Sequence, residues 1–140
     1  MTNEIIRAVS IALNAEFGDD YKIYGEEIKQ GLKEPCFFVQ CLEPTTELFI
    51  GRRYEKTTPL CIQYFPQSRR TPETECNEVA ERLMWCLEYI TMDGKPYRGT
   101  KMKYSIEDDV LNFFVNFDFF VRKVVDSAPM EIMKSDTAPE

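Results

Sequence analysis

The sequence contains no histidine among its 140 residues. Imidazole is the usual base of Ser-His and Cys-His nucleophile pairs and the donor group of His-x-x-His metal clamps. No other side chain titrates near neutral pH unless its pKa is strongly shifted. The absence of histidine therefore excludes the most familiar hydrolase layouts.

Long apolar segments and closely paired cysteines are also missing. No apolar run approaches the roughly 18 residues that a membrane-spanning helix needs. The first residues are polar, so we expect a soluble, cytoplasmic protein. The five cysteines are odd in number, and no two are spaced as Cys-x-x-Cys, the spacing of zinc sites and thiol-exchange motifs. We expect reduced, mostly buried thiols.

Positive charge is scarce, with 17 lysines and arginines against 24 acidic residues and a net charge of -7. Because affinity for phosphate backbones requires concentrated lysine and arginine, this balance argues against nonspecific nucleic-acid binding. Hydrophobic residues make up 44% and charged residues 29% of the chain, which is ordinary for a globular protein. We expect one domain over residues 1–125 and a flexible C-terminal tail over residues 126–140.

The clearest pattern present lies between Lys101 and Val125, which predicts two long strands joined by the acidic turn 107–109. Alternate positions of the second strand are apolar, at Leu111, Phe113, Val115, Phe117, Phe119 and Val121. This face is predicted to be core. The opposite face mixes aromatic and polar side chains. Such a face suits a sheet with helices on one side and a less permanent contact on the other.

Two helices are predicted. Helical spacing of Ile6, Val9, Leu13 and Phe17 marks the first. The second begins at Thr71, as N-cap, followed by Pro72. Its predicted buried stripe consists of Cys76, Val79, Ala80, Leu83, Leu87 and Ile90. We also expect Trp85 in the core.

Further strands are expected over residues 21–24, 36–42 and 60–65, with connections over 45–51 and 95–99. The predicted order is therefore αβββαββ with a long C-terminal β-hairpin. This order predicts a single-domain α+β fold, in which a mixed or antiparallel β-sheet packs against two α-helices.

One acidic constellation is the strongest candidate for an enzyme site, of the metal-dependent nuclease type, although the solvated-loop interpretation is preferred. Asp20 precedes Glu27-Ile28-Lys29, and two acids of this kind hold Mg²⁺ while the lysine stabilises charge on phosphate. The alternative is a solvated loop, because Glu27 and Lys29 fall in the least strand-like segment. Asp108 and Asp109 are a second pair of acids. Turns between strands favour aspartate for backbone reasons, so we expect these two to serve the turn rather than a catalytic site.

Two arginine pairs and one face of the last strand supply candidate contacts. The candidates are Arg52, Arg53, Arg69, Arg70, Phe114, Asn116, Asp118 and Phe120. The arginines fall in two neighbouring connections, where they form either a positive patch on an acidic body or an ordinary solvated surface. The two phenylalanines exceed what one core face needs, so we expect them to be exposed in the monomer or covered by another copy.

In its hydrophobic pattern and order of elements, the sequence resembles a known family, the small tail terminator or tail completion proteins of long-tailed bacteriophages and prophages, especially those of Gram-positive hosts. The resemblance covers about residues 1–125. It rests on the second predicted helix and on four segments, Asn3–Arg7, Pro35–Val39, Cys61–Pro66 and Asn116–Val121. These are patterns of hydrophobicity and element order rather than catalytic signatures.

The resemblance implies a structural protein of the virion, with no enzymatic activity and no cofactor or metal. Proteins of this family assemble as a ring, commonly a hexamer, on the last ring of a finished tail tube, stop tube polymerisation and provide the surface for head docking. The implied partners are further copies of the chain, the tail tube protein and a head-completion or connector protein, without membrane or specific nucleic-acid binding. The implied locations are the host cytoplasm during assembly and then the head-proximal end of the tail. A different head-tail connector or neck protein is the nearest alternative, and the nuclease is the other.

Overall fold

The computed structural model describes residues 2–25, 33–124 and 131–132. It contains two helices and a curled, mixed β-sheet in a single α+β domain, as predicted. The elements are α1 (Thr2–Phe17), β1 (Lys22–Tyr24), β2 (Cys36–Cys41), β3 (Thr45–Ile50), β4 (Arg53–Phe65), α2 (Pro72–Cys86), β5 (Tyr89–Met92), β6 (Lys95–Glu107), β7 (Val110–Val124) and β8 (Glu131–Ile132). The predicted order is present, with β3, β5 and β8 as additional strands.

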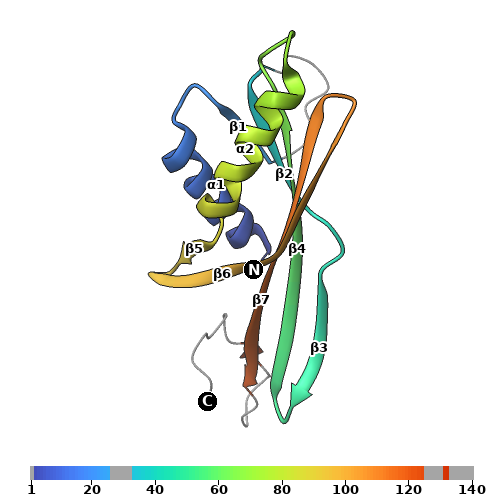
Figure 1. Cartoon of the computed structure of the whole chain (residues 1–140). Helices are drawn as coiled ribbons and strands as arrows, with labels where there is room; N and C mark the ends of the chain where they lie inside the picture. The colour runs from blue at the N-terminus through green and yellow to red at the C-terminus, as the bar shows by residue number, and fades with distance from the viewer. Residues whose placement is uncertain (1, 26–32, 125–130, 133–140) are drawn as a thin grey trace.

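The sheet is built around the long strands β4 and β7, which pair antiparallel from Arg53↔Arg122 to Tyr64↔Leu111. The strand order is β1-β2-β4-β7-β6-β5, and only β1 and β2 among these described neighbours run parallel. Strands β2 and β3 lie one after the other along the same edge of β4. Figure 1 shows both helices against the half of the sheet that contains β2, while β3 and the far ends of β4 and β7 extend beyond them.

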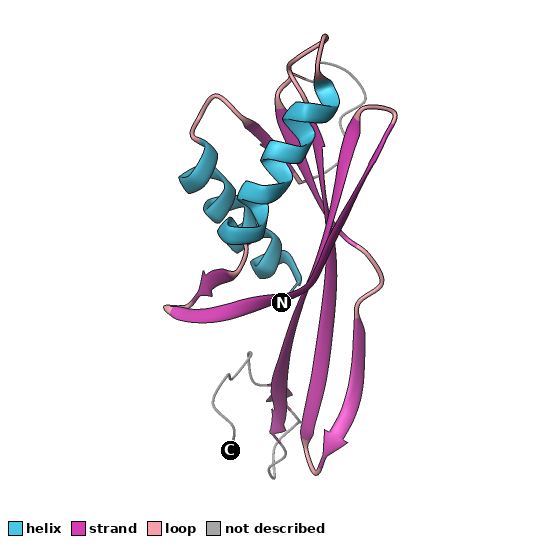
Figure 2. Cartoon of the chain, viewed as in Figure 1, coloured by secondary structure: helices cyan, strands magenta, loops and turns pink. Residues whose placement is uncertain are grey.

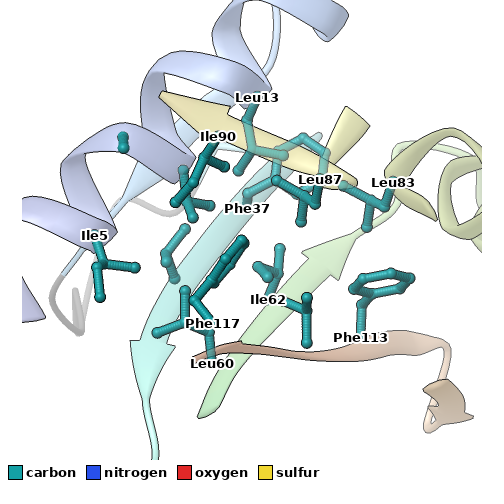
Figure 3. Packing of buried hydrophobic residues seen from close by; sticks show 14 of the residues in the cluster. Ile5, Leu13, Phe37, Leu60, Ile62, Leu83, Leu87, Ile90, Phe113 and Phe117 are labelled. Carbon is teal, nitrogen blue, oxygen red and sulfur yellow. The ribbon is translucent and has the colours of Figure 1, made fainter. Parts of the chain in front are cut away.

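The core lies between the helices and the sheet. Figure 3 shows Leu13 of α1 and Leu83 of α2 above Phe37, Ile62 and Phe113 of the strands. These side chains are completely buried, and each contributes on the order of 1.5–3 kcal/mol to stability by leaving water. The alternation predicted for the last strand is confirmed, because Leu111, Phe113, Val115, Phe117, Phe119 and Val121 are all buried.

Two tight turns join the hairpins. Asp108 and Asp109 both have positive φ, 52° and 64°, between the paired residues Glu107 and Val110. Positive φ at both central positions is the geometry of a type I′ turn, which matches the twist of paired strands. The acidic turn was therefore predicted correctly, and its aspartates serve the backbone. Asp93 and Gly94 make a similar turn between β5 and β6.

Four local predictions were wrong. Residues 95–99 belong to β6 rather than to a loop, because their backbone pairs with β5. Residues 45–50 form β3, whose six side chains are all exposed, so no alternation of burial marked the strand. Helix α2 ends at Cys86, and Trp85 is exposed rather than in the core. Leu87 and Ile90 are buried as predicted, but they lie beyond the helix.

Strand β6 changes partner at a bend. Its first residues pair with β5, and its later residues pair with β7 from Gly99↔Phe117 onward, with a register shift between Thr100 and Lys103. Lys101 within this bulge has a φ of 53°. Because β6 leaves β7 at this point, residues of β7 beyond Phe117 extend without it (Figure 2). No helix within the described residues is long and apolar enough to cross a membrane.

Candidate functional site

The most distinctive feature of the surface is a three-stranded arm, which consists of β3, residues 53–58 of β4 and residues 117–122 of β7. It projects from the domain on the side opposite the β6–β7 turn (Figure 1). From Phe117 to Arg122 it extends about 17 Å, at roughly 3.4 Å per residue. The outer edge of β3 forms no described strand pair, so its backbone groups are open to a partner.

The tip of the arm is apolar and exposed. Leu48, Phe49 and Ile50 are 61%, 58% and 62% exposed. The Phe49 ring lies 5.1 Å from the Phe120 ring, and the Arg53 guanidinium lies 5.3 Å from the Phe120 centroid. Phe120 is therefore half-buried beneath its own neighbours, and the exposed apolar surface predicted for it is supplied by β3 instead. Three adjacent exposed apolar residues are typical of a binding surface.

The tip is also basic. Arg52 and Arg53 follow the turn at Gly51, and Arg53 lies opposite Arg122 in the β4–β7 register. With Ile50 these residues line a shallow depression of about 350 Å³. The first predicted arginine pair is thus placed beside the apolar residues.

The second predicted arginine pair lies elsewhere. Arg69 and Arg70 lie in the loop that follows the other end of β4, and the strand itself spans about 40 Å from Arg53 to Phe65 at roughly 3.3 Å per residue. The two pairs therefore do not form the single positive patch that their sequence positions suggested. Arg69 makes a 3.3 Å ion pair with Glu34 while remaining exposed, and such a surface pair contributes little to stability.

The helix-free face of the sheet carries a ladder of amide groups. The Gln40 Nε2 donates to Gln63 Oε1 over 3.1 Å, and the Gln63 Nε2 donates to Asn112 Oδ1 over 3.0 Å. Thus one residue each of β2, β4 and β7 is linked across three strands. A side-chain network on a face that no described helix covers keeps these amides satisfied while leaving the surface polar.

The predicted contacts on β7 share this face. Phe114 is half-buried, with the Lys103 Nζ 5.6 Å from its ring centroid. The backbone carbonyl of Asn116 accepts a 3.4 Å hydrogen bond from the Thr100 hydroxyl. Asp118 is exposed. Together with Phe120 they lie along one strand, as predicted, but only Asp118 is exposed, and the other three are half-buried.

A second apolar surface lies on α2, where Met84 and Trp85 are exposed. They line an open groove beside β6. Sequence reasoning missed both this groove and the tip of the arm. A signal for the groove was present, because Trp85 falls two positions after the buried Leu83 and so outside the helical stripe.

The loop that carries Arg69 and Arg70 is held by a single carboxylate. Glu75 accepts hydrogen bonds from the Tyr64 hydroxyl and from the backbone N–H groups of Gln67 and Ser68, the last two at 2.9 Å each. Burial raises the pKa of Glu75, but these three hydrogen bonds outweigh it and hold the pKa below the usual value. Burial, followed by the hydrogen bond to Glu75, raises the pKa of Tyr64.

Chemically reactive groups do not converge in the described part of the chain. Burial raises the pKa of Cys36, Cys76 and Cys86 to about 11, so these thiols stay protonated at neutral pH. Within residues 2–25, 33–124 and 131–132, no group of three acidic or cysteine side chains is placed to hold a metal ion. Glu27 and Lys29 of the nuclease hypothesis lie outside the described residues, as does most of the predicted tail 126–140.

Comparison with known proteins identifies one family. A family model described as "Phage tail terminator protein" matches residues 4–129. No curated protein matches the chain. A solved structure that carries no functional name aligns over 91% of this chain and 99% of its own, with 9% identity and a TM-score of 0.39. It is one of 18 matching solved chains, and a similarity at this level carries no argument about function.

Proposed function

The chain belongs to the phage tail terminator family, and on that premise we propose that it forms a hexameric ring that caps the completed tail tube. Membership of the family gives the protein a structural role in a phage tail. In the proposed role, the ring stops polymerisation of the tube and then presents the surface to which the filled head docks. The observation that carries the proposal is the match over residues 4–129, which includes α1 from its third residue onward, all of α2 and the long strands β4, β6 and β7.

The shape of the surface supports ring formation. A ring of identical subunits needs two different surfaces on each copy that bind one another, with a rotation that closes. The arm supplies an exposed, apolar and basic projection on one side of the domain. A second surface, with exposed Met84 and Trp85, lies on α2 beside β6.

The overall charge supports a position on the path of DNA. The net charge of -7 disfavours binding to phosphate, so DNA passes through the ring without adhering to it. In this account the protein assembles in the cytoplasm of the bacterial host and ends at the head-proximal end of the virion tail. Its partners there are further copies of itself, the tail tube protein and a head-completion or connector protein.

The proposal is tested with tail tubes grown from the purified tube protein of the same phage. Added terminator binds one end of each tube, where electron microscopy detects it, and the mean tube length stops increasing with time. An equal amount of heat-unfolded protein serves as the control and leaves growth unchanged. Tubes that grow at the same rate with the folded protein present would refute the capping role.

A different neck protein is the nearest alternative, and it acts on a different step. A connector joins heads to tails that have already reached their length, so it would bind finished tails without limiting the growth of bare tubes. The tube-growth assay therefore separates the two roles.

A further inference from the structure

The single tryptophan of the chain lies on the surface. Trp85 is 77% exposed and Met84 is 43% exposed, both on α2. With Met102 of β6 they line an open groove of about 490 Å³ between the end of α2 and β6. An aromatic side chain in a groove of this size is the usual anchor of a protein interface.

The groove carries more negative than positive charge. Its polar lining consists of Glu81, Glu88 and Arg98. The guanidinium of Arg98 lies 6.0 Å from the ring of Tyr89, which is also exposed. The carboxylates thus outnumber the guanidinium, and the groove suits an apolar ligand that carries positive charge.

The tip of the arm has this chemistry. Leu48 and Ile50 expose more than half of their side chains, and the exposed Arg52 follows them after one turn residue. The apolar residues match Met84 and Trp85, and the arginines match the two carboxylates. The tip and the groove are therefore complementary in both apolar character and charge.

A tip and a groove of the same copy are too far apart to meet. Gly99, at the groove, pairs with Phe117, whereas Arg53, at the tip, pairs with Arg122. These two levels of β7 are separated by about 17 Å at roughly 3.4 Å per residue, and Figure 1 shows the arm directed away from α2. The groove must receive its ligand from another molecule.

We propose that the arm tip of one copy docks in the groove formed by α2 and β6 of the next copy. The contact joins two different surfaces, so it propagates from copy to copy until it closes into a ring. The inference specifies the subunit contact of the proposed terminator ring and so rests on the proposed function.

Trp85 reports on the contact directly. As the concentration of purified protein rises, the molar mass by light scattering increases and the emission of Trp85 moves to shorter wavelength as the indole leaves water. An arm variant, Leu48→Ser with Ile50→Ser and Arg52→Glu, requires a concentration about tenfold higher or more for both changes. A groove variant, Met84→Ser with Glu81→Ser, behaves in the same way and keeps the reporter.

Ile11→Ser is the matched control, because Ile11 is 64% exposed on α1 and outside both surfaces. This variant assembles like the wild type. Circular dichroism of each variant shows the wild-type spectrum, since every substituted side chain is exposed or on the rim of the groove.

Mixing the two variants gives the decisive result. The intact arm of the groove variant binds the intact groove of the arm variant, and neither partner offers a second site. The mixture therefore forms dimers and no larger species at concentrations where each variant alone is monomeric. The inference would be overturned if the wild type assembled without a change in Trp85 emission or stayed monomeric at every concentration. A mixture of the two variants that stayed monomeric would also overturn it.

Failure of the inference is distinguishable from failure of the proposed function. If the docking contact is wrong but the protein is a terminator, the arm and groove variants still stop tube growth in the capping assay. If the protein is not a terminator, the wild type itself fails to stop growth, whatever its state of assembly.

Discussion

Gly99 of β6 lies directly against the backbone of Leu87, just beyond the end of α2. A Cβ atom built on Gly99 would come 2.3 Å from the Leu87 carbonyl oxygen and 2.9 Å from the Val115 Cγ2. The Gly99 N–H also donates to the Glu88 carbonyl over 2.9 Å. This close contact fixes the end of the helix against the strand at the point where the sheet bends and the arm begins.

We predict that Gly99→Ala destabilises the fold by about 1–3 kcal/mol, because two packed backbones must separate to admit a methyl group. Urea unfolding measures the loss. Gly25→Ala is the control, since a Cβ atom at Gly25 meets no atom within 4 Å, and its effect stays within about 0.5 kcal/mol. Equal stability of both variants would show that the contact is unimportant.

Glu75→Gln should destabilise the protein at neutral pH by about 1–2 kcal/mol, because the carboxylate accepts three hydrogen bonds and is partly solvated. The pKa of Glu75 is lowered in the folded state. Its contribution is therefore present above the unfolded pKa, near 4.3, and is lost as pH falls through the folded value.

The difference between wild type and Glu75→Gln should accordingly shrink in acid. Unfolding free energies measured from pH 7 down to pH 3 (about 1 unit below the unfolded pKa) test this. Glu78→Gln, an exposed position of the same helix, shows no such difference. A gap that stays constant over the whole range would contradict the assigned role of the charge.

Arg82 should resist conservative replacement. Its Nε donates to the Glu16 carboxylate over 3.0 Å, its Nη2 donates to the Glu16 carbonyl over 2.9 Å, and its guanidinium lies 4.1 Å from the Phe17 centroid. Lysine cannot reproduce the planar fork or the stacked contact. We expect Arg82→Lys to cost about 0.5–1 kcal/mol in thermal or urea unfolding, and a cost of zero would argue against a link between α1 and α2.

The parts of the fold that face the core were predictable from the sequence. In β7 every second residue from Leu111 to Val121 meets buried side chains, so burial imposes an alternation that can be read directly. The turn at Asp108 and Asp109 was predictable for a local reason, since short polar residues tolerate positive φ.

The candidate site was less predictable because it faces away from the core. All six residues of β3 are exposed, so the strand depends on backbone pairing with β4, which leaves no pattern in the side chains. The separation of the two arginine pairs was not predictable for a related reason. It depends on β4 being one continuous strand between them, which its pairing with β7 maintains. The exposure of Trp85 was predictable from the sequence, because the residue lies outside the apolar stripe of the helix.

The length distribution of tails tests the central claim most directly. Phage with an early stop codon in this gene should produce tails of uncontrolled length without heads, and supplying the wild-type protein from a plasmid should restore a single length. Electron microscopy of the lysates measures both. Tails of normal, uniform length that merely fail to join heads would contradict the terminator account and would place the protein among the connectors.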